Sequence, residues 1–168
     1  MLLHLARPAA VAALALTTAF AGATSAAANG PAADQKADGV IVVAGNTCTW
    51  TGARTTAVPP AALVIDRTGV NKPGGNLTCG GGITASLNND PAFAFDDAAG
   101  TARTDLIDIT GRQSFVTCRY KAANLVWDRD GSTRKYVNRE FTATRTSGGF
   151  LCPASVTTAA GGASVLFH

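Results

Sequence analysis

Residues 113–146 read QSFVTCRYKAANLVWDRDGSTRKYVNREFTATRT, and this stretch decides the fold. Apolar residues in its first half alternate with polar ones, as a strand with one buried face requires: Val116, Cys118 and Tyr120. Asp130-Gly131 then marks a tight turn, because glycine accepts the positive φ that such turns need. On the return, apolar residues of one parity can face a common core: Val137, Phe141 and Ala143. The stretch predicts a long β-hairpin with an irregular outgoing strand.

Outside the hairpin, short apolar runs alternate with turn residues along the whole chain. Turn signals recur about every ten residues, and no apolar period of 3.6 persists beyond the N-terminal segment. Further strands are predicted over 40–43, 47–51, 61–66, 76–79, 83–87, 92–95, 104–110, 156–158 and 164–167. The pattern predicts an all-β fold, a single-domain antiparallel β-sandwich or barrel with two disulfides. We expect roughly seven to ten short strands in two sheets around one core.

The N-terminus is predicted to be a secretory signal peptide over residues 1–28. Arg7 supplies a positive charge, residues 9–20 form a short apolar run, and Ala26-Ala27-Ala28 offers a cleavage site before Asn29. The apolar run is too short and too diluted by Gly, Thr and Ser to cross a bilayer, so we predict no membrane insertion.

The segment after the predicted cleavage site differs from the rest of the chain. Residues 29–39 contain no large apolar side chain and are predicted to form a flexible arm. Residues 40–168 are then the all-β domain of a secreted, extracellular protein. Cleavage leaves 13 basic and 11 acidic residues, a net charge of +2 that does not favour nucleic acid as a partner.

The four cysteines predict two disulfides, because their number is even, the context is exported and none lies in a C-x-x-C pair. Three pairings are possible. We favour Cys48–Cys79 and Cys118–Cys152, because sequence neighbours in a meander of strands come to lie side by side. Zinc sites need closely spaced thiols or histidines, so no metal site is predicted.

Positive charge concentrates in the hairpin, where residues 112–145 hold eight basic and three acidic side chains. Such a surface is either a solvated sheet face or the binding site of an acidic partner protein. The candidate binding residues are Arg119, Arg134, Lys135, Tyr136 and Arg139 in the hairpin, with Asp34 and Lys36 in the arm.

Histidine is too scarce for the common catalytic arrangements. His4 lies in the predicted signal peptide and His168 is the last residue, whereas a Ser-His-Asp site needs a firmly held imidazole. Oxidised cysteines are not nucleophiles, so we predict neither an enzyme nor a cofactor. A carboxylate-dependent hydrolase built on Asp96 and Asp97 is the least favoured alternative. Residues 128–131, DRDG, are typical of a hairpin turn rather than a calcium loop.

The last third of the chain resembles the subtilisin-inhibitor-like proteins of actinobacteria. The matching features are Cys118-Arg119-Tyr120, LVWDRDG over 125–131, a Tyr-Val-x-Arg-Glu-Phe strand, Cys152 and a closing SVLF over 164–167. This resemblance implies a secreted serine-protease inhibitor that presents 119–124 as an exposed loop. In that family the first disulfide closes a shorter loop, and Arg119-Tyr120-Lys121 does not match the reactive site.

The build of the chain resembles the small secreted B subunit of the umbrella toxin particles of filamentous actinobacteria. The shared features are a signal peptide, an N-terminal arm, a compact disulfide-linked β domain and no catalytic set. In that family the subunit bridges a lectin-bearing subunit and a large toxin. The resemblance implies an adaptor in an extracellular, antibacterial toxin-type assembly. The leading hypothesis is therefore a non-catalytic protein-binding module, whose basic hairpin face meets an acidic surface of one or more secreted proteins.

Overall fold

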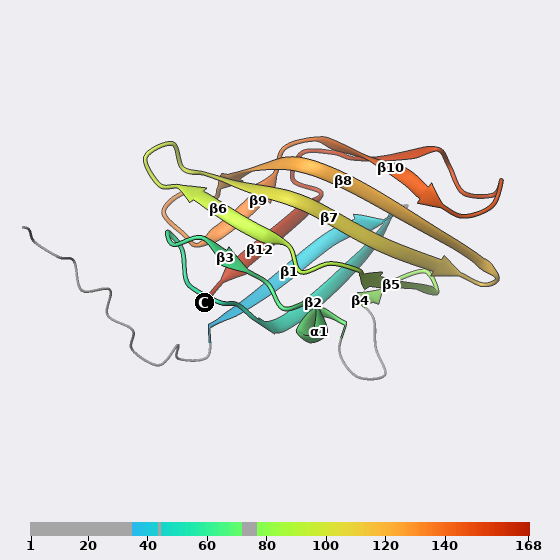
Figure 1. The fold of residues 1–168 in the computed structure, drawn as a ribbon, viewed down its shortest axis with the longest axis horizontal. Helices are drawn as coiled ribbons and strands as arrows, with labels where there is room; N and C mark the ends of the chain where they lie inside the picture. The colour runs from blue at the N-terminus through green and yellow to red at the C-terminus, as the bar shows by residue number, and fades with distance from the viewer. Residues whose placement is uncertain (1–34, 44, 72–76) are drawn as a thin grey trace, which may run out of the picture.

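The computed structural model describes residues 35–43, 45–71 and 77–168 (Figure 1). The predicted signal peptide, Asp34 and the part of the predicted arm before residue 35 lie outside the described residues. The described chain forms twelve strands and one short helix: β1 (Lys36–Val43), β2 (Asn46–Arg54), β3 (Leu63–Val64), α1 (Arg67–Val70), β4 (Leu77–Cys79), β5 (Ile83–Leu87), β6 (Ala92–Asp96), β7 (Thr101–Gln113), β8 (Val116–Arg129), β9 (Lys135–Asn138), β10 (Phe141–Ser147), β11 (Ser155–Thr158) and β12 (Ala163–Phe167). The four-residue helix is the only one in these ranges, and it is too short to span a membrane.

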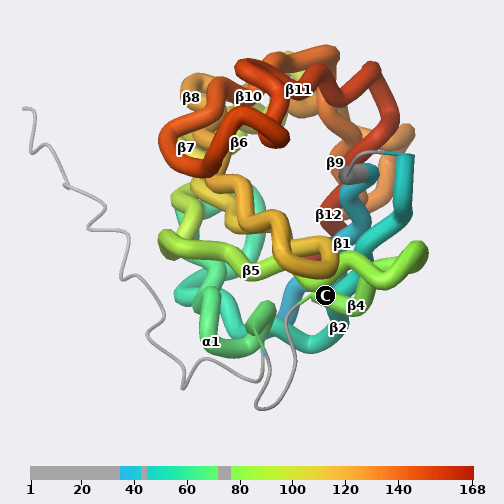
Figure 2. The backbone as a smooth tube through the Cα atoms, turned by 90° about the vertical axis from the view of Figure 1, so that its right-hand side faces the viewer, coloured from blue at the N-terminus to red at the C-terminus, as the bar shows by residue number. Residues whose placement is uncertain are grey.

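All strands belong to one antiparallel sheet that closes into a barrel. The sheet order is β11-β10-β8-β9-β12-β1-β2-β4-β5-β7-β6-β3, and β8 also pairs with β7. That second pairing closes a ring from β8 through β9, β12, β1, β2, β4 and β5 to β7, which Figure 2 shows end-on. The predicted all-β fold is confirmed as a barrel. The expected pair of sheets is wrong, because the long strands β7 and β8 pair with each other and close the sheet, with β10 and β11 extending it beyond β8 and β6 and β3 beyond β7.

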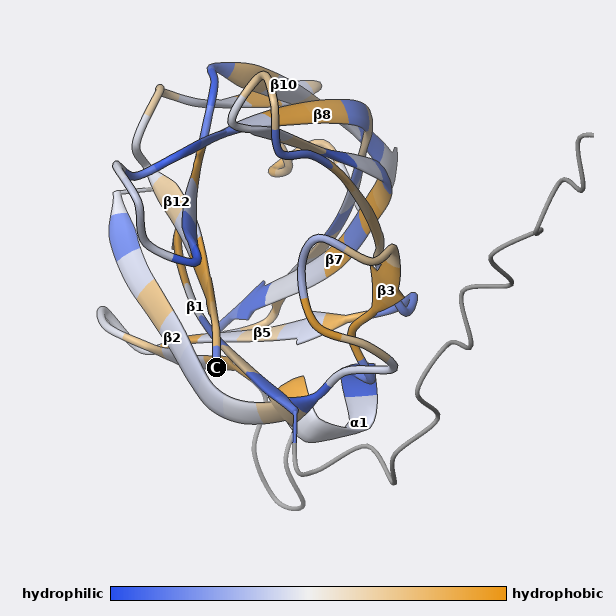
Figure 3. Cartoon of the chain, turned by 90° about the vertical axis from the view of Figure 1, so that its left-hand side faces the viewer, coloured by the Kyte–Doolittle hydropathy of each residue, from blue (hydrophilic) through white to orange (hydrophobic). Residues whose placement is uncertain are grey.

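The predicted hairpin is confirmed, including its irregular outgoing strand. In β8, Asn124 has a φ of 55°. The buried positions are even-numbered up to Ala122 and odd-numbered from Leu125, so the strand is irregular at Asn124. The return is two strands, since β9 pairs with the end of β8 and β10 pairs with its middle. Figure 3 shows hydrophobic and hydrophilic segments alternating along β7 and β8, as expected for strands with one inward face.

One detail of the return strand is wrong. Phe141 and Ala143 pack against the core, but in β9 Tyr136 and Asn138 are the buried residues and Val137 is not. The inward-facing positions have even numbers in β9 and odd numbers in β10, because two residues between the strands break the alternation. The three apolar positions therefore do not share a face.

The first strand begins earlier than predicted. Residues 36–39, predicted as flexible arm, lie in β1, where Ala37 pairs with Phe167 on one side and Ala53 on the other. Ala37 is fully buried, and Gly39 lies under the indole of Trp50. The prediction failed because small residues between two partner strands are ordered by backbone pairing and by their neighbours' side chains.

The two ends of the barrel are filled differently. At the end where the C-terminus lies, five aromatic rings pack together with centroid separations of 5.1–6.3 Å: Phe93, Phe95, Trp127, Tyr136 and Phe167. We call this the aromatic end. Both disulfides, Cys48–Cys79 and Cys118–Cys152, lie toward the opposite end, and they confirm the favoured pairing. We call this second end the open end.

A candidate binding site at the open end of the barrel

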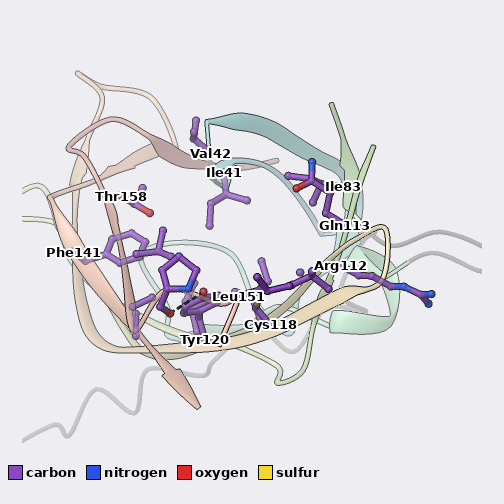
Figure 4. A pocket seen from close by; sticks show the side chains of 18 residues that line it. Ile41, Val42, Ile83, Arg112, Gln113, Cys118, Tyr120, Phe141, Leu151 and Thr158 are labelled. Atoms are coloured by element: carbon purple, nitrogen blue, oxygen red, sulfur yellow. Dashed lines mark hydrogen bonds between the residues drawn. The ribbon is translucent and has the colours of Figure 1, made fainter. Parts of the chain in front are cut away.

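An apolar cavity of about 280 Å³ occupies the barrel interior at the open end (Figure 4). Its wall is built from inward-facing residues of β1, β5, β7, β8, β10 and β11, among them Ile41, Ile83, Ile107, Ile109, Tyr120 and Phe141. The cavity exists because three neighbouring strands present small residues to it: Gly111 on β7, Ala122 on β8 and Ala143 on β10. Large aromatic side chains fill the corresponding space at the aromatic end.

No ionic side chain points into this cavity from the described residues. Arg112 lies at its edge, but its guanidinium extends away from the interior, and its Nε donates to the carbonyl of Ser114 (3.2 Å). The hydroxyl of Tyr120 donates to the carbonyl of Pro153 (3.1 Å), and burial raises the pKa of this phenol. The hydroxyl of Thr158 is a further polar group of the wall. The site is suited to binding apolar groups, not to acid–base chemistry.

Exposed apolar side chains surround the mouth of the cavity. Phe115 is 84% exposed, Phe150 is 93% exposed and Leu151 is 53% exposed. Phe115 lies in the two-residue turn between β7 and β8, and the other two lie in the loop between β10 and β11. The β10–β11 loop contributes Leu151 and Pro153 to the cavity wall, and the residues that flank the β7–β8 turn, Gln113 and Val116, also line it. We call these three residues the apolar rim.

The β10–β11 loop is braced on both sides. The Cys118–Cys152 disulfide ties it to β8, and Arg145 donates hydrogen bonds to the carbonyls of Gly149 (3.0 Å) and Cys152. At Gly148 φ is 123°, and a Cβ there would lie 2.9 Å from the carbonyl oxygen of Thr117, so the close approach requires glycine. The exposed Phe150 is therefore presented on a fixed loop, and binding through it costs little ordering entropy.

The outer surface of the strands that border the cavity is basic. Residues 107–113 and 116–122 contain three cations and one carboxylate, a net charge of +2: Arg112, Arg119 and Lys121, with Asp108. Asp108 is 3% exposed and accepts from Arg119 Nε (2.8 Å) and Nη2 (2.7 Å), while Lys121 Nζ lies 3.4 Å away. The Arg119 hydrogen bonds lower the pKa of Asp108 to about 2, with Asn88 and Lys121 helping against the opposing effect of burial.

The predicted binding residues do not form one surface. Arg134 and Lys135 lie at the aromatic end, as does Lys36 at the start of β1. Arg119 lies on the outer face of β8, the strand whose inner face lines the cavity. Lys135 pairs with Asp130 (3.4 Å), and Arg139 pairs bidentately with Asp128. Arg134 is exposed and makes no ion pair within the described ranges.

Tyr136 was predicted to supply aromatic contact area, and this prediction is wrong. Its side chain is 2% exposed and packs against Phe95 and Phe167 inside the barrel. The alternation of β9 points it inward, while Lys135 and Val137 face outward. Desolvation by this burial raises the pKa of its phenol.

The segments named for the alternative functions also lie elsewhere than predicted. Residues 119–124 are not an exposed loop but the middle of β8, paired with β7 and, at 119–121, with β10. Asp96 and Asp97 lie at the β6–β7 turn, where Asp96 accepts from the amide of Ala99 and Asp97 pairs with Arg129 (3.1 Å). Within the described ranges no group of three His, Cys, Asp or Glu side chains is placed to hold a metal ion.

The apolar rim and the cavity were not predicted, although the sequence contains a local signal for the rim. Phe150-Leu151 follow Gly148-Gly149 and precede Cys152-Pro153, so two large apolar residues stand in a turn-rich segment tied by a cysteine. Comparisons with protein-family models, with curated proteins and with solved structures find no match to this chain. The function is therefore argued from the geometry of the barrel itself.

Proposed function

We propose that this protein is a non-catalytic, secreted binding module that joins another extracellular protein through the open end of its barrel, as an adaptor in an extracellular assembly. The observation that carries the proposal is the apolar rim: three large apolar side chains exposed in two sequence-distant loops at the same end of the barrel, one of which, Leu151, also lines the cavity. Exposed apolar patches of this kind are typical of protein-binding surfaces.

The chemistry of the partner follows from the surroundings of the rim. The centre of the site is apolar and aromatic, as in the energetic centre of many protein interfaces, and residues 107–113 and 116–122 of the flanking strands carry a net charge of +2. The fitting partner is a secreted protein that presents protruding apolar side chains encircled by carboxylates. Two disulfides are typical of proteins in oxidising compartments, which supports secretion of this protein and hence an extracellular partner.

The basic residues at the aromatic end contribute less to this proposal than predicted. Lys135 and Arg139 already have carboxylate partners within the chain. These ion pairs must be broken or shared before the two cations can bind carboxylates of another protein. Residues 29–34, from the predicted arm, stay a second candidate contact.

The test compares two variants in binding to culture supernatant proteins. Phe115→Ser with Phe150→Ser removes two rim side chains, whereas Leu166→Ser removes an exposed apolar side chain (40% exposed) on β12, at the aromatic end. We expect the tagged wild-type protein and the Leu166→Ser variant to retain the same partner at stoichiometric level, and the double variant to lose it. Partner retention by the double variant, or recovery of monomer alone with the wild type at low salt, would exclude the open end as the interface.

A serine-protease inhibitor is the second candidate, on a loop other than the one predicted. The β10–β11 loop is exposed, is braced by a disulfide and presents Phe150-Leu151 to solvent. An inhibitory loop must bind a protease as a substrate does and resist cleavage, and a rigid, exposed loop meets both requirements. Titration of subtilisin and chymotrypsin with the purified protein tests it. Stoichiometric loss of protease activity that Phe150→Ser abolishes would support inhibition, and unchanged activity at excess protein would remove it.

A further inference from the structure

The cavity below the apolar rim is large enough to be a binding site in its own right. We propose that it binds a small, uncharged, mostly hydrocarbon molecule with on the order of ten non-hydrogen atoms. The proposal does not depend on the adaptor function, because it concerns the interior of the barrel, to which the rim contributes Leu151 but neither Phe115 nor Phe150.

The size of the ligand follows from the volume of the cavity. About 280 Å³ is roughly nine times the 30 Å³ that a water molecule occupies in the liquid. This is near the lower end of the range for ligand pockets in proteins, so the space suits a medium-length aliphatic chain or one or two fused rings.

The chemical class follows from the wall. Isoleucine, valine and phenylalanine side chains dominate it, the phenol of Tyr120 is already bonded to Pro153, and the guanidinium of Arg112 extends away. A buried water needs two to four polar partners, and the side chains offer little beyond the Thr158 hydroxyl and the amide of Gln113, whose Nε2 already donates to the carbonyl of Gly81 (3.2 Å). Water is therefore poorly bound in this space, and an apolar ligand displaces it at little cost. A charged ligand would lose its hydration without finding a counter-ion.

The isoleucines make the proposal testable inside the protein. The chain has five, of which four line the cavity: Ile41, Ile83, Ile107 and Ile109. The fifth, Ile65, is buried in the core outside the cavity wall and serves as an internal control. Protein with ¹³C-labelled isoleucine δ1-methyl groups is titrated with 1-octanol, and the methyl signals are followed by NMR. We expect saturable shifts of the four cavity methyl signals and an unmoved Ile65 signal.

A cavity-filling variant supplies the control. Gly111 lines the cavity, and a Cβ built on it meets no atom within 4 Å, so the side chain of Gly111→Leu can leave the backbone without a clash and occupy part of the cavity. We expect this variant to lose the octanol-induced shifts; Ala143→Leu, which also faces the cavity, repeats the test if the first variant does not fold. Any of three results would overturn the proposal. They are the absence of shifts up to the solubility of octanol, equal shifts of all five signals, and unchanged shifts in a folded cavity-filling variant.

The rim and the cavity are tested independently. Phe115→Ser with Phe150→Ser should keep the octanol shifts while losing the protein partner. Gly111→Leu should lose the octanol shifts while keeping that partner. If each variant loses only its expected activity, both proposals stand. Absence of a protein partner with intact octanol shifts overturns the adaptor proposal alone, and absence of octanol shifts with an intact partner overturns the cavity proposal alone.

Discussion

Replacing Asp108 with Asn tests how much the ion cluster on the outside of the open end contributes to stability. The carboxylate is almost fully buried and is held by two hydrogen bonds from Arg119, one from Asn88 and an ion pair with Lys121. Asn is nearly isosteric with Asp but carries no charge, so the substitution removes the electrostatic part of the cluster with little change in packing.

The magnitude follows from the pKa of Asp108, which is about 2 in the folded protein and 3.8 for the reference group. At roughly 1.4 kcal/mol per pKa unit, the ionised form stabilises the folded state by about 2 kcal/mol. A lowered pKa means that this stability is present above pH 3.8 and is lost as pH falls through about 2. Asp108→Asn should therefore be about 2 kcal/mol less stable than the wild type at pH 7, and the difference should vanish near pH 2.

The assay is urea unfolding at a series of pH values between 2 and 7, with the free energy of unfolding extrapolated to water for each protein. Asp97→Asn is the matched control, because Asp97 forms an exposed pair with Arg129, and its loss should change stability by less than about 1 kcal/mol. If the wild-type and Asp108→Asn curves stay parallel over the whole pH range, the assigned role of the cluster is wrong.

Three further substitutions test the interior and the aromatic end. Gly39→Ala would place a Cβ 1.9 Å from the indole of Trp50, so we expect a loss of about 1–3 kcal/mol and altered tryptophan fluorescence. Thr104→Val removes the acceptor of the buried Trp127 Nε1 hydrogen bond (2.9 Å) and should cost about 1–3 kcal/mol in urea unfolding, whereas a smaller loss would mean that the indole finds another partner. Arg134→Ala should change the midpoint of unfolding little, by less than about 0.5 kcal/mol, because the side chain is exposed and makes no ion pair among the described residues.

Local features of the fold were predictable because they depend on neighbouring residues. Alternation predicted the strand over 83–87, which the structure has as β5, and Asp130-Gly131 predicted the turn after β8. Closure of the barrel was not predictable in this way, since it depends on which distant strand edges meet. The parity change between β9 and β10 explains the wrong inward face assigned to Val137.

The candidate site was harder to predict than the fold. The basic residues of the hairpin are close in sequence, but the barrel places Arg119 outside the open end and Lys135 at the aromatic end. Charge counted along a chain cannot reveal that most of these cations have carboxylate partners across strands. A cavity arises from space between side chains on several strands, so no single segment of sequence encodes it.

The distribution of the disulfides has a consequence for how the protein matures. The aromatic end is held by packed rings, whereas the end with an unfilled interior carries both covalent crosslinks. Before oxidation, the strands around the hollow end lack both a dense interior and a tether, so we expect this end to order last. Under the proposed secreted binding function, acquisition of binding competence would then coincide with disulfide formation in an oxidising compartment.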